Sequence, residues 1–210
     1  MLKEKVGQRL MIGITGTHLD RETEEHLKGI NPGSVILFKR NISSAHQTAE
    51  LISHIKDLLP SPPLIAIDQE GGRVIRFTSD ITVFPGNMAL GATGSTDLAY
   101  KQGLESASQL KEIGIDINLA PVVDVITTYH NPGITIRSFG DDPHKVADFA
   151  VAFIEGTQTM GVAAVAKHFP GKGAAEVDAH FDLPTISIPK DLFEELHLYP
   201  FRQAIKNGVQ

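Results

Sequence analysis

Short apolar runs alternate with longer segments of helical periodicity along the whole chain. Five of the apolar runs are too short for helices, and their nearly continuous apolar character predicts buried parallel strands. They cover residues 10–14, 33–38, 64–67, 115–123 and 162–166. The segments around them predict helices over residues 20–28, 45–59, 96–113, 143–160 and 190–207. This alternation is typical of an α/β fold with a parallel sheet.

Capping residues and helix breakers predict where several of these elements begin and end. Ser44 can cap the helix that starts at residue 45, and Gly29 is expected to close the helix over residues 20–28. The stretch from about residue 75 to Gly94 is expected to be irregular. A polar loop also separates the fourth strand from the helix that starts at Pro143.

One junction occurs three times, with a glycine between a helix end and an apolar strand start. The glycines are Gly114, Gly161 and Gly208, and glycine readily adopts the left-handed conformation that ends many helices. Val209 is therefore predicted to begin a sixth strand. The repetition predicts a (β/α)8 TIM-barrel type of fold, incomplete, with about five βα units present.

A flavodoxin-like doubly wound sheet of five strands is the alternative fold, and it would suit a chain of this length. Two features count against it. The first strand–helix turn lacks a phosphate-binding loop, and polar residues end several strands rather than one switch point. A single domain over residues 1–210 is the default for this length.

The amino-acid composition argues against some classes of binding partner. Hydrophobic residues make up 41% and charged residues 21% of the 210 residues, as in ordinary globular proteins. The net charge of −6 argues against nucleic acid or an anionic membrane surface as a partner. The absence of cysteine excludes disulfides and thiolate metal sites. No signal peptide or membrane span is predicted, so a cytoplasmic location is expected.

The fifth predicted strand leads into the stretch with the strongest candidate chemistry. Lys167 and His168 follow it directly, and a Pro/Gly loop over residues 169–173 comes next. Ligands bind at the carboxyl ends of strands in α/β proteins. A charged pair there is costly unless it is paired or functional. Because neighbouring strand residues point to opposite sides, one of the two is expected to face the barrel axis and the other the rim.

Asp178 and His180 form a candidate pair in the next loop. A carboxylate partner fixes the tautomer of a histidine and stabilises its charged form, which suits proton transfer near neutral pH. Two solvated loop residues are the plain alternative. A zinc or iron site with His168 is a second rival. Loop ligands ten residues apart are a weak signal, so no metal and no cofactor are predicted.

Three further polar residues are candidates with structural alternatives. Asp68 ends the third strand before two glycines, and it could bind a ligand or act as a turn carboxylate. Asp124 ends the fourth strand in a similar way, but a cap or a loop salt bridge is the more common role for a carboxylate there. Arg137 could clamp a hydroxyl or carboxylate, or lie at the surface. The other histidines lack a convergent partner and are predicted at the surface. They are His18, His26, His46, His54, His130, His144 and His197.

Five stretches, in order along essentially the whole chain, resemble the N-terminal barrel of glycoside hydrolase family 3. They are ILFKRN (36–41), IDQEGGRV (67–74), APVVDV (120–125), RSFG (137–140) and KHFPG (167–171). The Asp-x-His pair at Asp178 and His180 is similar to that of the family's β-N-acetylglucosaminidases of the NagZ type. The family's β-glucosidases lack this pair.

The resemblance implies a retaining, exo-acting glycosidase that removes terminal β-N-acetylglucosamine (GlcNAc) from cell-wall or chitin-derived oligosaccharides. His180, oriented by Asp178, would be the acid/base on a mobile loop. Four residues would hold hydroxyls of the terminal sugar. They are Asp68, Arg137, Lys167 and His168.

Two departures from the family pattern affect these expectations. Residues 172–175 (KGAA) stand where members usually have His and then Gly-Asp-Thr, which bears on the loop's resting conformation and the leaving group. The family's nucleophilic aspartate would lie beyond Gln210, and no residue here matches it. A non-catalytic sugar-binding protein and a family 3 β-glucosidase or xylosidase therefore stay open. An incomplete barrel would also expose its fifth strand to association.

Overall fold

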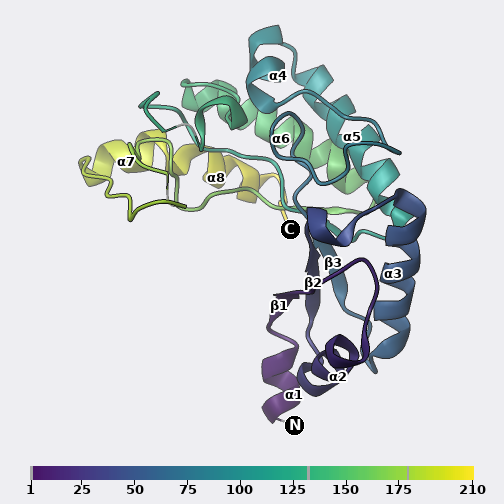
Figure 1. The fold of residues 1–210 in the computed structure, drawn as a ribbon. Helices are drawn as coiled ribbons and strands as arrows, with labels where there is room; N and C mark the ends of the chain where they lie inside the picture. Colours follow the sequence, from purple (N-terminus) through teal and green to yellow (C-terminus); the bar gives the residue numbers. More distant parts are fainter. Residues whose placement is uncertain (1, 132, 179) are drawn as a thin grey trace.

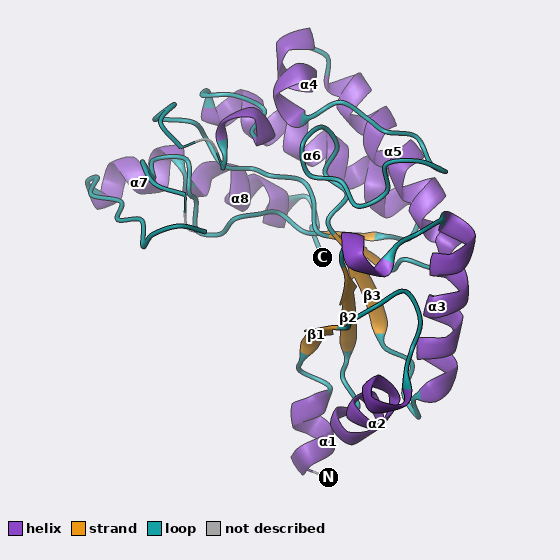
Figure 2. Cartoon of the chain, viewed as in Figure 1, coloured by secondary structure: helices purple, strands orange, loops and turns teal. Residues whose placement is uncertain are grey.

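The computed structural model of the chain describes residues 2–131, 133–178 and 180–210. Its strands form one five-stranded sheet in which each neighbouring pair is parallel (Figures 1 and 2). The strands are β1 (Met11–Gly13), β2 (Ser34–Leu37), β3 (Leu64–Ile67), β4 (Ile117–Asn118) and β5 (Ala163–Ala164).

The strand order decides between the two predicted folds. The order β1-β2-β3-β4-β5 follows the chain, whereas a flavodoxin-like sheet places its second strand outside the first. The α/β fold of the barrel type is therefore confirmed. Within the described residues the sheet is not closed, and the outer edges of β1 and β5 have no strand partner.

The molecule is curved, and α3 and α5 lie along its outer side, with α3 outside β1–β3 (Figure 1). Helix α6 packs between α5 and α8. The α-helices are α1 (Leu2–Gly7), α2 (Arg21–Ile30), α3 (Ala45–Leu58), α4 (Asn87–Thr93), α5 (Thr96–Ile113), α6 (Pro143–Thr159), α7 (Lys190–Leu196) and α8 (Leu198–Lys206). Two short 3-10 turns are η1 (Lys39–Asn41) and η2 (Thr135–Arg137).

The predicted capping chemistry is present in the structure. The Ser44 side chain accepts a hydrogen bond from the backbone N–H of Gln47 at the start of α3. Gly114, Gly161 and Gly208 have φ angles of 98°, 71° and 79°, so all three junction glycines are left-handed as predicted. Val209, in contrast, lies in no strand of the described chain.

Several elements differ from the prediction. Helix α2 continues past Gly29 to Ile30, and Asn31, which takes the left-handed conformation, caps it. Helix α4 forms inside the stretch expected to be irregular, where Gly91 lies against the backbone of Phe139. The last predicted helix is divided into α7 and α8, because Pro200 has no N–H to donate to the carbonyl four residues earlier. The fourth and fifth strands are also shorter than predicted.

Among the described residues, two large apolar clusters and a smaller one around Ile154 and Ala204 hold the molecule together. The first lies between the early strands and α2, α3 and α5, and it includes Leu27, Ile55 and Ile65. The second lies under the later loops and includes Phe149 and Phe153 of α6. None of the helices in the described part of the chain is long and apolar enough to cross a membrane. The cytoplasmic location stays a prediction.

Candidate active site

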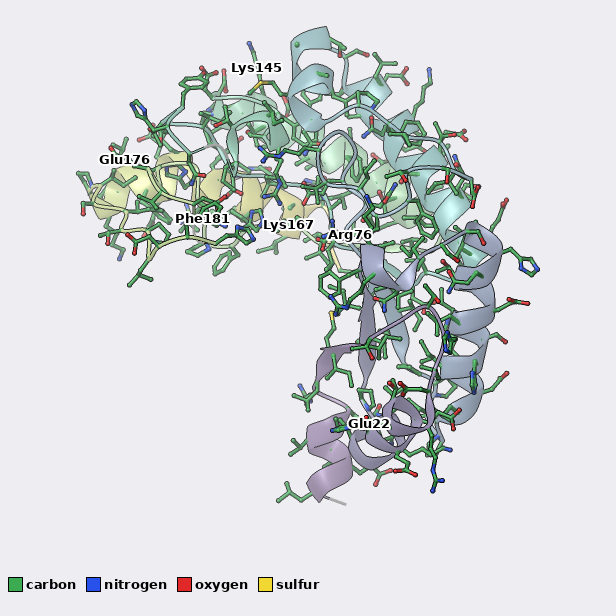
Figure 3. The ribbon with its side chains drawn as sticks, in the orientation of Figure 1. Glu22, Arg76, Lys145, Lys167, Glu176 and Phe181 are labelled. Carbon is green, nitrogen blue, oxygen red and sulfur yellow. The ribbon has the colours of Figure 1, made fainter. Side chains whose placement is uncertain are left out.

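Polar side chains that follow β3, β4 and β5 meet at the carboxyl edge of the sheet, around a cleft of about 460 Å³. Known small-molecule sites have volumes of this order. All four predicted sugar-binding residues line the cleft, and so does His180. In Figure 3, Arg76 and Lys167 mark its position on the inner side of the curve. The cleft is therefore the candidate active site.

A buried ion cluster forms the floor of the cleft. Lys167 Nζ lies 2.8 Å from Asp68 Oδ1 and 2.5 Å from Glu70 Oε1. Arg76 Nη2 lies 2.8 Å from the other oxygen of Asp68. The Glu70 side chain is only 3% exposed, so its charge depends on these protein partners instead of water. We call Asp68, Glu70, Arg137 and Lys167 the floor cluster.

Arg137 joins the floor cluster through a two-pronged contact with Glu70. Its Nε and Nη2 atoms donate to the two carboxylate oxygens at 2.9 and 2.7 Å, which is the strong bidentate geometry. Its Nη1 donates to the carbonyl of Gly133 at 2.7 Å. Burial alone would lower the pKa of Arg137, but the hydrogen bond and the charge of Glu70 outweigh burial and raise it. Arg137 is therefore a fixed cation.

The contacts of His168 define its tautomer. Its Nε2 lies 3.2 Å from Arg137 Nη2, and an arginine nitrogen can only donate, so Nε2 accepts. The proton is then on Nδ1, which donates to Asp124 Oδ2 at 2.7 Å. Asp124 is fully buried and also accepts from the backbone N–H of Lys172 at 2.6 Å. Asp124 thus fixes both the His168 ring and the loop that follows.

Opposing effects set the charge of Asp68. Burial would raise the pKa of its carboxyl group, whereas the charges of Lys167 and Arg76 and their hydrogen bonds lower it. The net effect lowers the pKa below its ordinary value. Asp68 is therefore an anion near neutral pH, held between two cations.

A side-chain amide holds the turn that carries Asp68 and Glu70. Asn118 of β4 is buried, and its side chain accepts from the N–H of Gln69 at 3.1 Å and donates to the carbonyl of Gln69 at 3.0 Å. Gln69 Oε1 accepts in turn from the backbone N–H of Arg76 at 2.8 Å. These contacts keep both carboxylates at the end of β3.

His197 corrects the prediction that the remaining histidines lie at the surface. It is fully buried at the junction of α7 and α8, and its Cβ lies where a side chain on Gly171 would go. Burial lowers the pKa of His197, although the charge of Asp124 opposes this. Sequence reasoning missed it because the fold, and not the neighbouring residues, buries α8 under the loop over residues 169–173.

The Asp178–His180 pair has the geometry expected of a dyad. Asp178 Oδ1 lies 2.7 Å from His180 Nδ1 and accepts from the His180 backbone N–H at 3.1 Å. These hydrogen bonds, from the side chain first, lower the pKa of Asp178. The His180 side chain is 75% exposed, in contrast to the floor cluster. The pair leaves Nε2 of His180 available for a ligand's proton.

The alternative interpretation was a metal site formed by His168, Asp178 and His180, and the structure does not arrange these residues as one set of ligands. His168 pairs with Asp124, and His180 pairs with Asp178. Among the described residues, no group of three or more His, Asp or Glu side chains is arranged to hold a metal ion.

Two details of the site differ from the prediction. Lys167 and His168 both line the cleft, because Lys167 makes only an isolated bridge with Val122 and His168 begins a turn, where strand alternation no longer applies. Glu70 was given no role, yet it is the central anion of the floor cluster. Its position shortly after β3, on the same turn as Asp68, was the available signal.

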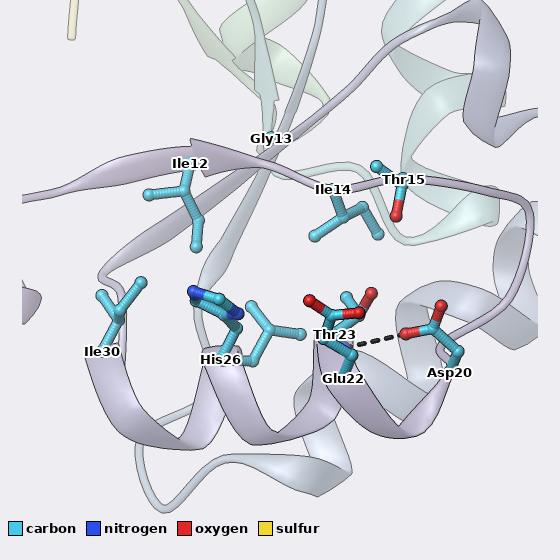
Figure 4. A pocket seen from close by; sticks show the side chains of 10 residues that line it. Ile12, Gly13, Ile14, Thr15, Asp20, Glu22, Thr23, His26 and Ile30 are labelled. Carbon is cyan, nitrogen blue, oxygen red and sulfur yellow. Dashed lines mark hydrogen bonds between the residues drawn. The ribbon is translucent and has the colours of Figure 1, made fainter.

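A second cavity, of about 430 Å³, lies between β1 and α2 (Figure 4). Ile12, Ile14 and Ile30 line it together with polar side chains that include Glu22 and His26. None of the predicted site residues lines it. The chemistry therefore favours the cleft at the carboxyl edge.

Comparisons with known proteins point to one family. The family model described as "Glycosyl hydrolase family 3 N terminal domain" matches residues 1–210. A "Beta-hexosaminidase" of Xylella fastidiosa (strain M12) is 37% identical over 206 residues, which are 95% of this chain and 61% of that protein. The same figures hold for a "Beta-hexosaminidase" of Stenotrophomonas maltophilia (strain K279a). The chain thus spans about three fifths of the length of these curated relatives.

Solved structures give the same result. A glycoside hydrolase family 3 β-N-acetylglucosaminidase from Paenibacillus sp. str. FPU-7 superimposes with a TM-score of 0.97 at 39% identity, over 100% of this chain and 40% of that one. NagZ from Neisseria gonorrhoeae, in complex with N-trifluoroacetyl-D-glucosamine, gives a TM-score of 0.90 at 34% identity, over 95% of this chain and 61% of that one.

Proposed function

Because the chain belongs to glycosyl hydrolase family 3, as its N-terminal domain, we propose that it forms the sugar-binding and acid/base part of a retaining exo-β-N-acetylglucosaminidase. The substrates would be GlcNAc-terminated oligosaccharides from cell walls or chitin. The names of the relatives, beta-hexosaminidase and β-N-acetylglucosaminidase, support this substrate class.

One observation carries the proposal: the floor cluster and His180 line the same cleft. The floor cluster presents fixed anions and cations side by side, which suits a ligand rich in hydroxyl groups that donate and accept. The dyad adds a group that can transfer a proton at the rim of the same space. A terminal sugar on the floor would bring its glycosidic oxygen toward His180.

The residues then have separate roles in the proposed reaction. Lys167 and Arg137 would donate to sugar hydroxyls, and Asp68 would accept from them. His180 would protonate the leaving oxygen through Nε2 and later take a proton from water, in the two-step manner of retaining glycosidases. Asp178 would keep the His180 proton on Nδ1 in the neutral ring. The proposal nominates no residue of this chain as the nucleophile.

Hydrolysis of an aryl N-acetyl-β-glucosaminide tests the proposal. The assay uses this chain and a version extended to the length of its relatives, each with GlcNAc binding measured by calorimetry. We expect the extended protein to release the aryl group and to leave an aryl β-glucoside intact. NMR should show the β-anomer of GlcNAc as the first product. An α-anomer would refute the retaining mechanism.

The same assay addresses the two alternatives. GlcNAc binding without turnover by either form would replace the proposal with a sugar-binding protein. Faster hydrolysis of an aryl β-glucoside or xyloside than of the N-acetylglucosaminide would favour the family's other substrate class.

A further inference from the structure

Residues 131 and 133–137, which we call the connecting segment, link the floor cluster to the dyad, and Arg137 at the end of the segment is itself a member of the floor cluster. Arg137 is held by Glu70 and donates through Nη1 to the carbonyl of Gly133 at 2.7 Å. At the start of the segment, Asn131 donates through Nδ2 to the carbonyl of Val177 at 3.1 Å. Val177 directly precedes Asp178. The segment therefore contacts both parts of the site.

Internal hydrogen bonds make this segment compact. The side chain of Asn131 accepts from the N–H of Gly133 at 2.9 Å, and its backbone carbonyl accepts from the hydroxyl of Thr135 at 2.6 Å. The N–H of Arg137 donates to the carbonyl of Ile134 at 2.7 Å. Asn131 and Ile134 are both buried. These hydrogen bonds therefore fix the position of Gly133 relative to Arg137.

The Asp178 carboxylate of the dyad lies close against Gly133. A Cβ atom on residue 133 would lie 2.4 Å from Asp178 Oδ2 and 2.7 Å from Asp178 Cγ. The Asp178 carboxylate therefore occupies the space that any other residue would fill. The closeness of the Asp178 carboxylate therefore accounts for the missing side chain at residue 133.

We propose that the connecting segment positions the dyad relative to the floor cluster, and that Gly133 is the positioning residue. The proposal rests on the proposed function. A side chain at residue 133 would turn the Asp178 carboxylate and withdraw Oδ1 from His180 Nδ1. The added Cβ atom would also lie 3.1 Å from Asn131 Oδ1, so the segment itself would need to shift only slightly, whereas the Asp178 carboxylate would have to move away.

The test is Gly133→Ala in the form of the protein that shows turnover, with Gly29→Ala as the matched control. Gly29 lies in α2 with no atom within 4 Å of its added Cβ and no left-handed angle. We expect Gly133→Ala to lower kcat at least tenfold and to change KM and GlcNAc binding less than twofold. Gly29→Ala should match the parent in all three.

A double-mutant cycle shows whether Gly133 acts through Asp178. In an Asp178→Ala background, Gly133→Ala should cause no further loss of kcat. An equal loss in both backgrounds, or an unchanged kcat in the single variant, would overturn the proposal.

A second readout does not need turnover. Carbon-13 NMR titration of the Asp178 carboxyl group in this chain should give a pKa below the ordinary value in the parent and a higher pKa in Gly133→Ala, because the hydrogen bonds from His180 are lost. An unchanged Asp178 pKa would overturn the proposal even if the protein hydrolyses no glycoside. If the pKa of Asp178 rises in Gly133→Ala but no form of the protein hydrolyses the glycoside, the positioning role of Gly133 stands and the proposed function is wrong.

Discussion

The floor cluster and the dyad lie on the same cleft but are built in different ways. The carboxylates of the floor come from the end of β3, are largely buried, and each pair with two cations. The dyad lies on a loop, with Asp178 and His180 two residues apart and His180 mostly exposed. The floor is therefore pre-organised by long-range contacts, whereas the dyad is held by one local pair and by its contact with residue 133.

This difference predicts that the two parts respond differently to substitution. Glu70→Gln keeps the size of the side chain but removes the anion between Arg137 and Lys167. Removing one partner of a buried ion pair typically costs about 3–5 kcal/mol, so the free energy of unfolding should fall by about that amount. Asp178→Asn should cost less than about 1 kcal/mol. Urea unfolding at pH 7 measures both, and equal losses would contradict the contrast.

His180→Ala should lower activity without lowering stability. Loss of a general acid/base lowers the rate by about 10²–10⁴-fold, so kcat for the aryl N-acetyl-β-glucosaminide should fall within that range. GlcNAc binding and the unfolding free energy should stay at the parent values, because the side chain is exposed and the floor is untouched. Turnover close to the parent rate would remove His180 from the acid/base role.

Burial of His197 should also make the unfolding free energy depend on pH. Its pKa is lower in the folded protein than the unfolded value of about 6.5, so the unfolded chain binds more protons between these two values. The unfolding free energy should therefore fall as the pH drops below about 6.5. His197→Phe should reduce this slope, measured by urea unfolding between pH 5 and 8. Equal slopes in the parent and in His197→Phe would show that His197 does not titrate with folding.

Lys172 should give the smallest effect, although it lines the cleft and departs from the family pattern. Asp124 binds its backbone N–H, so the contact survives any change of side chain other than proline. Lys172→Ala should alter the unfolding free energy by less than about 0.5 kcal/mol. Asp124→Ala removes the acceptor itself and should destabilise the protein measurably more. Similar unfolding curves for the two variants would contradict this account of the loop.

Much of the fold could be predicted from local signals. Helix and strand periodicity, the capping Ser44 and the three left-handed glycines depend on short-range chemistry, and the structure has them where predicted. The motifs at strand ends also identified the residues that line the cleft, since parallel strands bring their carboxyl ends to one edge. The missed break before α8 was also local, because Pro200 was overlooked.

What the sequence alone determined is thus the order of elements, the family and the types of residue at the site. Tertiary structure decided the pairing: Glu70 lies 67 residues from Arg137, His197 is buried by a distant loop, and Asp178 rests on Gly133. Such contacts have no period or spacing in the sequence. They arise only when packing brings distant loops together and removes water from the charges between them.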